Sequence, residues 1–150
     1  MNVKELGHIV LYVHNVERSA HFYRNVLGWH EITDAVPGRR AAAFSSGRTH
    51  HELLLIEVGE DATPTVRGRR AGLYHFGLKV GETDEELRQV LQTLQENDVT
   101  IVGASDHTVT HSLYILDPDG NEIELYIDVQ PEVWRDDPKA VLSPVKPLAL

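Results

Sequence analysis

Short stretches in which apolar and polar residues alternate recur along the chain, and each predicts a half-buried β-strand. The first runs from Leu6 to Val13. Apolar residues then recur at helical spacing from Val16 to Leu27, between Asn15, a favoured N-cap residue, and Gly28, a favoured helix stop. Three further extended stretches follow, at 31–34, 40–45 and 51–58. The first half of the chain therefore predicts the element order βαβββ.

The second half repeats this order. A strand pattern at 73–80 precedes an amphipathic helix, which Thr83 and Glu86 open with the spacing of a capping box. Three strand patterns complete the half, at 100–104, 112–116 and 122–129. An internal repeat of this kind indicates a duplicated module, and it aligns His8 in the first strand of one copy with His75 in the other.

These patterns predict an α+β fold of two tandem βαβββ modules, at about 4–60 and 71–129, within one domain over 1–130. Residues 131–150 contain four of the seven prolines and no clear period, which predicts an extended C-terminal tail.

Side chains alternate between the two faces of a strand, so each polar candidate can be compared with its neighbours. His8, His75 and Glu124 each fall opposite the apolar residues that flank them in their strands. One cavity could therefore collect two imidazoles and one carboxylate. These are the ligands of nonheme Fe(II) and Mn(II) sites that leave adjacent positions open, and Zn(II) or Ni(II) would accept them too.

The amino-acid composition excludes several classes of binding partner and metal ligand. Acidic residues outnumber basic ones by 23 to 14, and the net charge of -9 argues against nucleic acid or an anionic membrane. The chain has no cysteine, so thiolate ligands and disulfides are excluded. No stretch reaches the roughly 20 apolar residues of a membrane helix, and the first residues lack a signal-peptide cleavage site, so we expect a cytoplasmic protein.

Three segments contain the candidate ligands: GHIVLYVHNVERSAHFYRNVLG, YHFGLKV and LYILDPDGNEIELY. In these segments the chain resembles the vicinal oxygen chelate superfamily of glyoxalases, bleomycin resistance proteins and extradiol dioxygenases, over about residues 4–129. The resemblance implies a cup-shaped incomplete barrel around one divalent metal, held by His8, His75 and Glu124. It also implies a homodimer.

The stretch RTHHELLLIEV distinguishes the branches of this superfamily. Glu52 in the cavity would add a fourth ligand, as in glyoxalase I, whereas His51 would resemble the extradiol, catechol 2,3-dioxygenase-like branch. An ungapped comparison of ELLLIEV with IELYIDV pairs Leu53 with Glu124 and turns residues 51, 53, 55 and 57 toward the cavity. This comparison favours His51, although a β-bulge would reverse the choice. His50 is expected to lie outside the cavity.

The extradiol branch implies further roles. Tyr114, ten residues before Glu124, would donate a hydrogen bond to a substrate oxygen, His107 would orient the diol, and His51 would act as acid or base. The expected function is ring cleavage of a catechol-like diol with O2, with Fe(II) as the first choice of metal and Mn(II) as the second.

Two other functions stay open. A metal-dependent lyase, isomerase or thiol transferase, of the glyoxalase or fosfomycin-resistance type, would use Zn(II) or Ni(II) and a fourth ligand such as Glu52. A binding protein of the bleomycin-resistance type would use the pocket without metal. The expected partners are a small-molecule substrate, O2 and a second copy of the chain.

Overall fold

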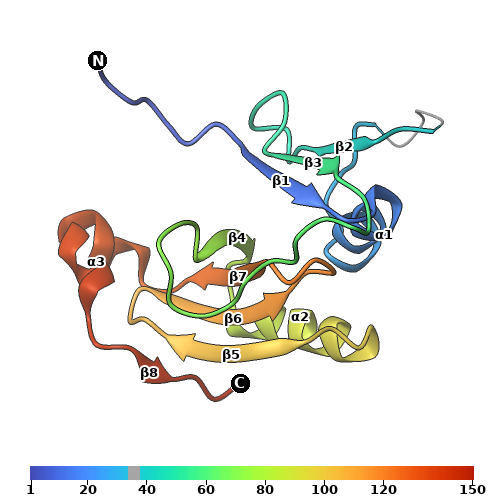
Figure 1. Ribbon diagram of the computed structural model, residues 1–150. Helices are drawn as coiled ribbons and strands as arrows, with labels where there is room; N and C mark the ends of the chain where they lie inside the picture. Colours follow the sequence, from blue (N-terminus) through green and yellow to red (C-terminus); the bar gives the residue numbers. More distant parts are fainter. Residues whose placement is uncertain (34–37) are drawn as a thin grey trace. The chain divides into compact units, whose positions relative to one another are not determined.

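The computed structural model describes residues 1–33 and 38–150, and the chain divides into two compact units, 1–65 and 66–150 (Figure 1). Unit 1 contains β1 (Ile9–Val13), α1 (Val16–His21), a π-helical turn (Phe22–Val26), β2 (Ala41–Phe44) and β3 (Leu53–Glu57). Its sheet has the order β1-β3-β2, with β1 parallel to β3 and β2 antiparallel to β3. Glu31 forms an isolated bridge with Phe44, and Asp34, the end of the predicted strand 31–34, lies outside the described residues.

Unit 2 contains β4 (His75–Gly81), α2 (Asp84–Glu96), β5 (Ile101–Asp106), β6 (Thr110–Leu116), β7 (Glu122–Asp128), α3 (Pro131–Asp136), a 3-10 helix (Pro138–Leu142) and β8 (Lys146–Pro147). Its five-stranded sheet has the order β4-β7-β6-β5-β8. The first strand of each unit pairs in parallel with a strand that follows the helix and closes the repeat, β3 in unit 1 and β7 in unit 2. The predicted α+β fold with a duplicated βαβββ-like sheet is confirmed.

Each sheet buries one face. In unit 2 the buried residues of β6 and β7 alternate with polar ones, and α2 packs on β4 and β7. The core side chains on this face are Leu113, Ile115, Ile123, Leu125 and Ile127, all 1% exposed or less. The opposite face, which we call the open face of unit 2, carries Glu122, Glu124 and Tyr126. These three side chains are half-buried.

Capping side chains fix both helix starts as the sequence predicts. Asn15 accepts a hydrogen bond from the Arg18 amide at 2.9 Å, and Thr83 and Glu86 form the expected capping box on α2. The predicted continuous helix to Leu27 instead ends in the π-helical turn, and Gly28, with φ of 68°, stops it.

The strand register contradicts the ungapped comparison of the two modules. Ile9 follows His8 and pairs with Leu53 in unit 1. Phe76 follows His75 and pairs with Ile123 in unit 2, so Leu53 and Ile123 occupy equivalent positions. Leu54 is therefore the counterpart of Glu124, and Leu53 is fully buried in the core. The expectation that residues 51, 53, 55 and 57 face the cavity is wrong, so alternation gives no support to His51.

β4 also differs from β1 by a bulge. The β4–β7 register shifts between Lys79 and Gly81, whereas β1 pairs with β3 without interruption. Val80 is thus one extra residue in β4. The comparison of β3 with β7 fails because β3 ends at Glu57, whereas β7 continues to Asp128, one residue past the counterpart of Glu57.

The C-terminal segment differs from an extended tail. It forms α3 and the 3-10 helix, and β8 then pairs antiparallel with the end of β5. Trp134 is 39% exposed and Leu142 is 82% exposed, so neither side chain is fully buried. Along the described parts of the chain, no helix combines the length and the apolar character that crossing a membrane requires.

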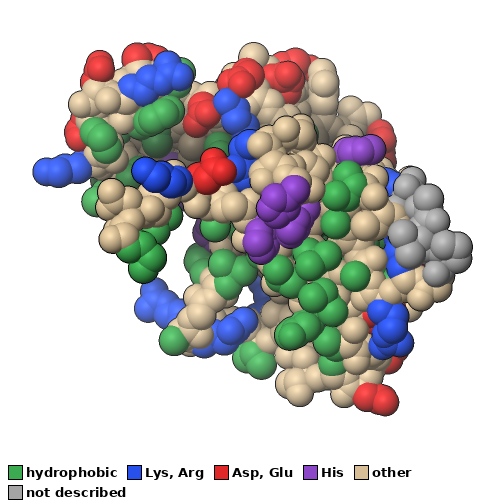
Figure 2. Space-filling view, turned by 90° about the horizontal axis from the view of Figure 1, so that it is seen from above, with side chains coloured by type: hydrophobic (Ala, Val, Ile, Leu, Met, Phe, Trp, Pro, Cys, Tyr) green, Lys and Arg blue, Asp and Glu red, His purple; other side chains and the backbone are tan. Residues whose placement is uncertain are grey.

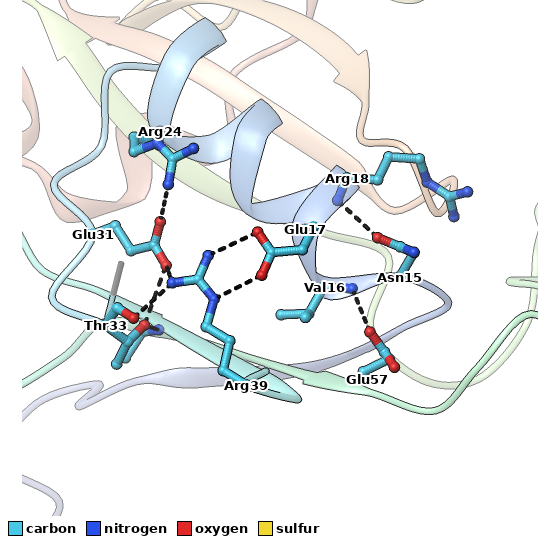
Figure 3. Close-up of polar contacts among 10 residues, drawn as sticks. Asn15, Val16, Glu17, Arg18, Arg24, Glu31, Thr33, Arg39 and Glu57 are labelled. Atoms are coloured by element: carbon cyan, nitrogen blue, oxygen red, sulfur yellow. Dashed lines mark hydrogen bonds and ion pairs between the residues drawn. The ribbon is translucent and has the colours of Figure 1, made fainter. Parts of the chain in front are cut away.

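In unit 1 a buried ion-pair network connects Arg39, which precedes β2, with Glu31 and with Glu17 on α1 (Figure 3). The Glu31 side chain is fully buried between the guanidinium groups of Arg24, at 2.6 Å, and Arg39. Arg39 is itself 4% exposed and reaches Glu17 on α1 at 3.2 Å. Two charges are thus removed from water together, and each depends on its partner.

We expect Glu31→Ala to lower the free energy of unfolding by about 3–5 kcal/mol, because Arg39 would stay buried without its main partner. Glu17→Ala removes an exposed partner of the same arginine and should cost less than about 1 kcal/mol. Urea denaturation of the two variants measures both values, and equal losses would contradict a dominant role for the buried pair.

Candidate functional site

The open face of unit 2 brings four of the predicted site residues together. His75 Nε2 lies 3.4 Å from Glu124 Oε2, and the rings of His75 and Tyr114 meet edge to face with centroids 5.4 Å apart. Tyr114 donates a hydrogen bond to Glu124 Oε1 at 3.1 Å, and His107 Nε2 lies 2.7 Å from the Tyr114 hydroxyl oxygen. The arrangement follows from the register, because Tyr114 pairs with Glu124 across β6 and β7.

The two oxygens of Glu124 have different surroundings. Oε1 accepts hydrogen bonds from Tyr114 and from the buried hydroxyl of Ser112, at 2.7 Å, whereas Oε2 is the oxygen that faces His75. Gly77 on β4 leaves room beside it, since a Cβ there would lie 3.6 Å from Glu124 Oε2. One oxygen is therefore anchored and the other is directed at the imidazole.

This pair fits one edge of a metal site. Two donor atoms that each lie about 2.1 Å from a divalent metal, at an angle of about 90–110°, are about 3.0–3.4 Å apart. The 3.4 Å between His75 Nε2 and Glu124 Oε2 agrees with this range. Within the described ranges, no three His, Asp or Glu side chains gather into a set that could hold a metal. A third ligand from His8 stays a prediction.

The choice of His107 over His111 is supported by contacts. The hydroxyl of Tyr114 has one hydrogen, so while it donates to Glu124 it must accept a hydrogen bond from His107 Nε2. His111 instead bonds Asp84 at the start of α2, 2.6 Å away. His107, Tyr114 and Glu124 thus form one continuous hydrogen-bonded chain.

Unit 1 brings the other two predicted residues together. The rings of His8 and His51 have centroids 4.5 Å apart, and His50 joins them with its Nδ1 2.5 Å from that of His51. Figure 2 shows histidine side chains gathered on the surface beside hydrophobic ones. Partial desolvation, and then the neighbouring His50 and His8, lower the pKa of His51. His50 is exposed, and its place outside the cavity stays a prediction.

Glu52 lies on the strand side shared with Leu54, and its carboxylate turns to the β2–β3 loop. It accepts hydrogen bonds from the Ser46 amide at 2.5 Å and from the Ser46 hydroxyl at 2.6 Å, and it pairs with Arg48 at 3.1 Å. Although desolvation opposes them, the hydrogen bonds from Ser46 and the charge of Arg48 lower the pKa of Glu52 overall. Glu52 is therefore an ionised carboxylate already engaged by its own loop.

Two residues of the site were not singled out from the sequence. Ser112 anchors Glu124, and Glu122 places its Oε1 3.7 Å from His75 Nδ1. Strand alternation could have found both, because Ser112 shares a face with Tyr114, and Glu122 shares one with Glu124.

The phenol of Tyr114 is held in its neutral form. Desolvation first, and then the charge of Glu124 and the hydrogen bond to it, raise the pKa of Tyr114. A raised pKa in the folded state adds stability below the usual tyrosine pKa of about 10, and this stability is lost as the pH rises above it.

We therefore expect the free energy of unfolding of Tyr114→Phe to fall less steeply at alkaline pH than that of the unmodified protein. Urea unfolding from about pH 9 to about pH 12 would measure the slope. Tyr12→Phe, at a side chain that is 71% exposed, serves as the matched control. The same alkaline slope in Tyr114→Phe and the unmodified protein would show that the phenol is not held in this way.

Comparisons with known proteins agree with the fold. A family model described as the Glyoxalase/Bleomycin resistance protein/Dioxygenase superfamily matches residues 5–125. A catechol-2,3-dioxygenase of Bacillus subtilis is 34% identical over 88% of this chain and 44% of its own length, so the chain spans less than half of that relative. A metallothiol transferase of Staphylococcus epidermidis is 27% identical over 84% of this chain and 83% of its own length.

Among solved structures, a glyoxalase/dioxygenase from Nostoc punctiforme superimposes with a TM-score of 0.69 at 24% identity. The match covers 86% of this chain and 94% of that one, and at this identity it supports the fold alone.

Proposed function

The chain belongs to the glyoxalase/bleomycin resistance protein/dioxygenase superfamily, and from that premise we propose that it is a metal-dependent extradiol-type dioxygenase that cleaves a catechol-like diol with O2. The observation that carries the proposal is Glu124, with one oxygen anchored by Ser112 and Tyr114 and the other facing His75 Nε2. The similarity to a catechol-2,3-dioxygenase supports the choice of reaction.

His8, His75 and Glu124 would hold one divalent metal, Fe(II) in the first place and Mn(II) in the second. When bound, such a metal supplies Lewis-acid positions at which both diol oxygens and O2 can be held side by side. The chain would act as a homodimer whose metal-site domain spans residues 1–130.

The remaining predicted residues would act on the substrate. Tyr114 donates its hydroxyl hydrogen to Glu124 in the structure and would redirect it to a diol oxygen, while His107 holds the phenol in place. His51, whose lowered pKa favours the neutral imidazole, would accept a proton from the diol. Ring cleavage then places both atoms of O2 in the product.

A metal-dependent transferase or lyase is the second candidate function. Two observations favour it: the register puts Glu52 on the strand side of Leu54, and the metallothiol transferase matches over most of its length. In such an enzyme Glu52 would leave Ser46 and Arg48 and become a fourth ligand, with Zn(II) or Ni(II) as metal.

Metal analysis and O2 uptake test the proposal. We expect the protein reconstituted with Fe(II) to bind one metal per chain and to consume O2 with a catechol. His8→Ala, His75→Ala and Glu124→Ala should each weaken metal binding by about 100-fold or more. His21→Ala, on the exposed side of α1, is the control and should change neither property.

The outcomes separate the candidates. If the protein binds metal but consumes no O2, and if Glu52→Ala also loses the metal, the transferase or lyase becomes the assigned function. Full metal binding in the three ligand variants would contradict both.

A further inference from the structure

The imidazole of His75 lies between two carboxylates. Its Nε2 is 3.4 Å from Glu124 Oε2, and its Nδ1 is 3.7 Å from Glu122 Oε1. Nδ1 is buried and has no hydrogen-bond partner within the described part of the chain. A buried ring nitrogen without a partner is unfavourable, so this atom needs an acceptor or a donor nearby. Glu122 is the carboxylate on its side.

The strand pairing explains why Glu122 stands there. β4 runs parallel to β7, and His75 pairs with Glu122 while Gly77 pairs with Glu124. The two carboxylates therefore project from the same face of β7, one on each side of the imidazole. The missing side chain at Gly77 keeps the space beside Glu124 open.

Glu122 is itself held in place. Its side chain is 14% exposed, and its Oε2 lies 4.0 Å from Arg67 Nη2, which leaves Oε1 on the side of His75. Glu122 raises the pKa of the Tyr74 phenol, and the ring of Tyr74 packs against that of His75 with centroids 4.5 Å apart. The carboxylate thus has anchors that do not involve the metal-facing side of the imidazole.

We propose that Glu122 is a positioning residue for His75: it accepts the Nδ1 hydrogen and so presents the Nε2 lone pair toward Glu124. A neutral imidazole carries its hydrogen on one nitrogen only, and the acceptor beside one nitrogen decides which is free to bind a metal. A small movement closes the gap between Nδ1 and Oε1. The inference rests on the proposed metal site, in which Nε2 of His75 is a ligand.

The tautomer of His75 tests this in the metal-free protein. Long-range proton–nitrogen NMR correlation, in alkaline buffer where imidazole is neutral, distinguishes the protonated from the free ring nitrogen. We expect hydrogen on Nδ1 in the unmodified protein and a shift to Nε2 in Glu122→Ala, where Glu124 becomes the remaining acceptor. Hydrogen on Nε2 in the unmodified protein, or no change in Glu122→Ala, would overturn the proposal.

Metal affinity supplies the second readout, with Zn(II) as a diamagnetic probe in competition titrations. Glu122→Ala should weaken binding by about 10- to 100-fold, and Glu122→Gln should recover part of the loss because its amide oxygen still accepts the hydrogen. Glu85→Ala removes the same charge from the exposed face of α2, where its partner is Arg88, and should not change the affinity.

The two measurements separate the possible failures. If the unmodified protein binds no Zn(II), the proposed function fails, and the tautomer still decides the role of Glu122. If the unmodified protein binds Zn(II) and Glu122→Ala binds it equally well, the positioning role is wrong and the metal site stands.

Discussion

Strand β7 imposes the constraint on which unit 2 depends. Both of its edges are paired, with β4 in parallel and with β6 in antiparallel, so its backbone has no freedom to slip. Its side chains must then alternate, with Ile123, Leu125 and Ile127 in the core and the carboxylates on the open face. A shift of one residue would bury Glu124 and expose Leu125, so the burial that stabilises the sheet also fixes the orientation of the candidate ligand.

Much of this arrangement could be predicted from local patterns. The capping residues Asn15 and Thr83 begin their helices as expected, and alternation places His75, Tyr114 and Glu124 on a common face. The failures come from features that local patterns do not encode. β7 extends one residue beyond the counterpart of Glu57, where β3 ends, so aligning the strand ends gave the wrong register. The buried Glu31–Arg39 pair depends on a contact between separate segments.

The corrected register shows how the two copies of the module have diverged. Unit 1 carries Val10, Leu54 and Ile56 at the positions where unit 2 carries Gly77, Glu124 and Tyr126. The first set is apolar, whereas the second contains a carboxylate and a phenol. The carboxylate of Glu124 in unit 2 thus has an apolar counterpart, Leu54, in unit 1.

The proposed function depends on His8, His75 and Glu124 binding one metal. A crystal structure of the Mn(II)-loaded protein, with anomalous diffraction recorded near the absorption edge of the metal, tests it most directly. We expect a single anomalous peak per metal-site domain, about 2.0–2.3 Å from one nitrogen of each histidine and from Glu124. A peak held by other residues, or a peak that His8 does not reach, would contradict it.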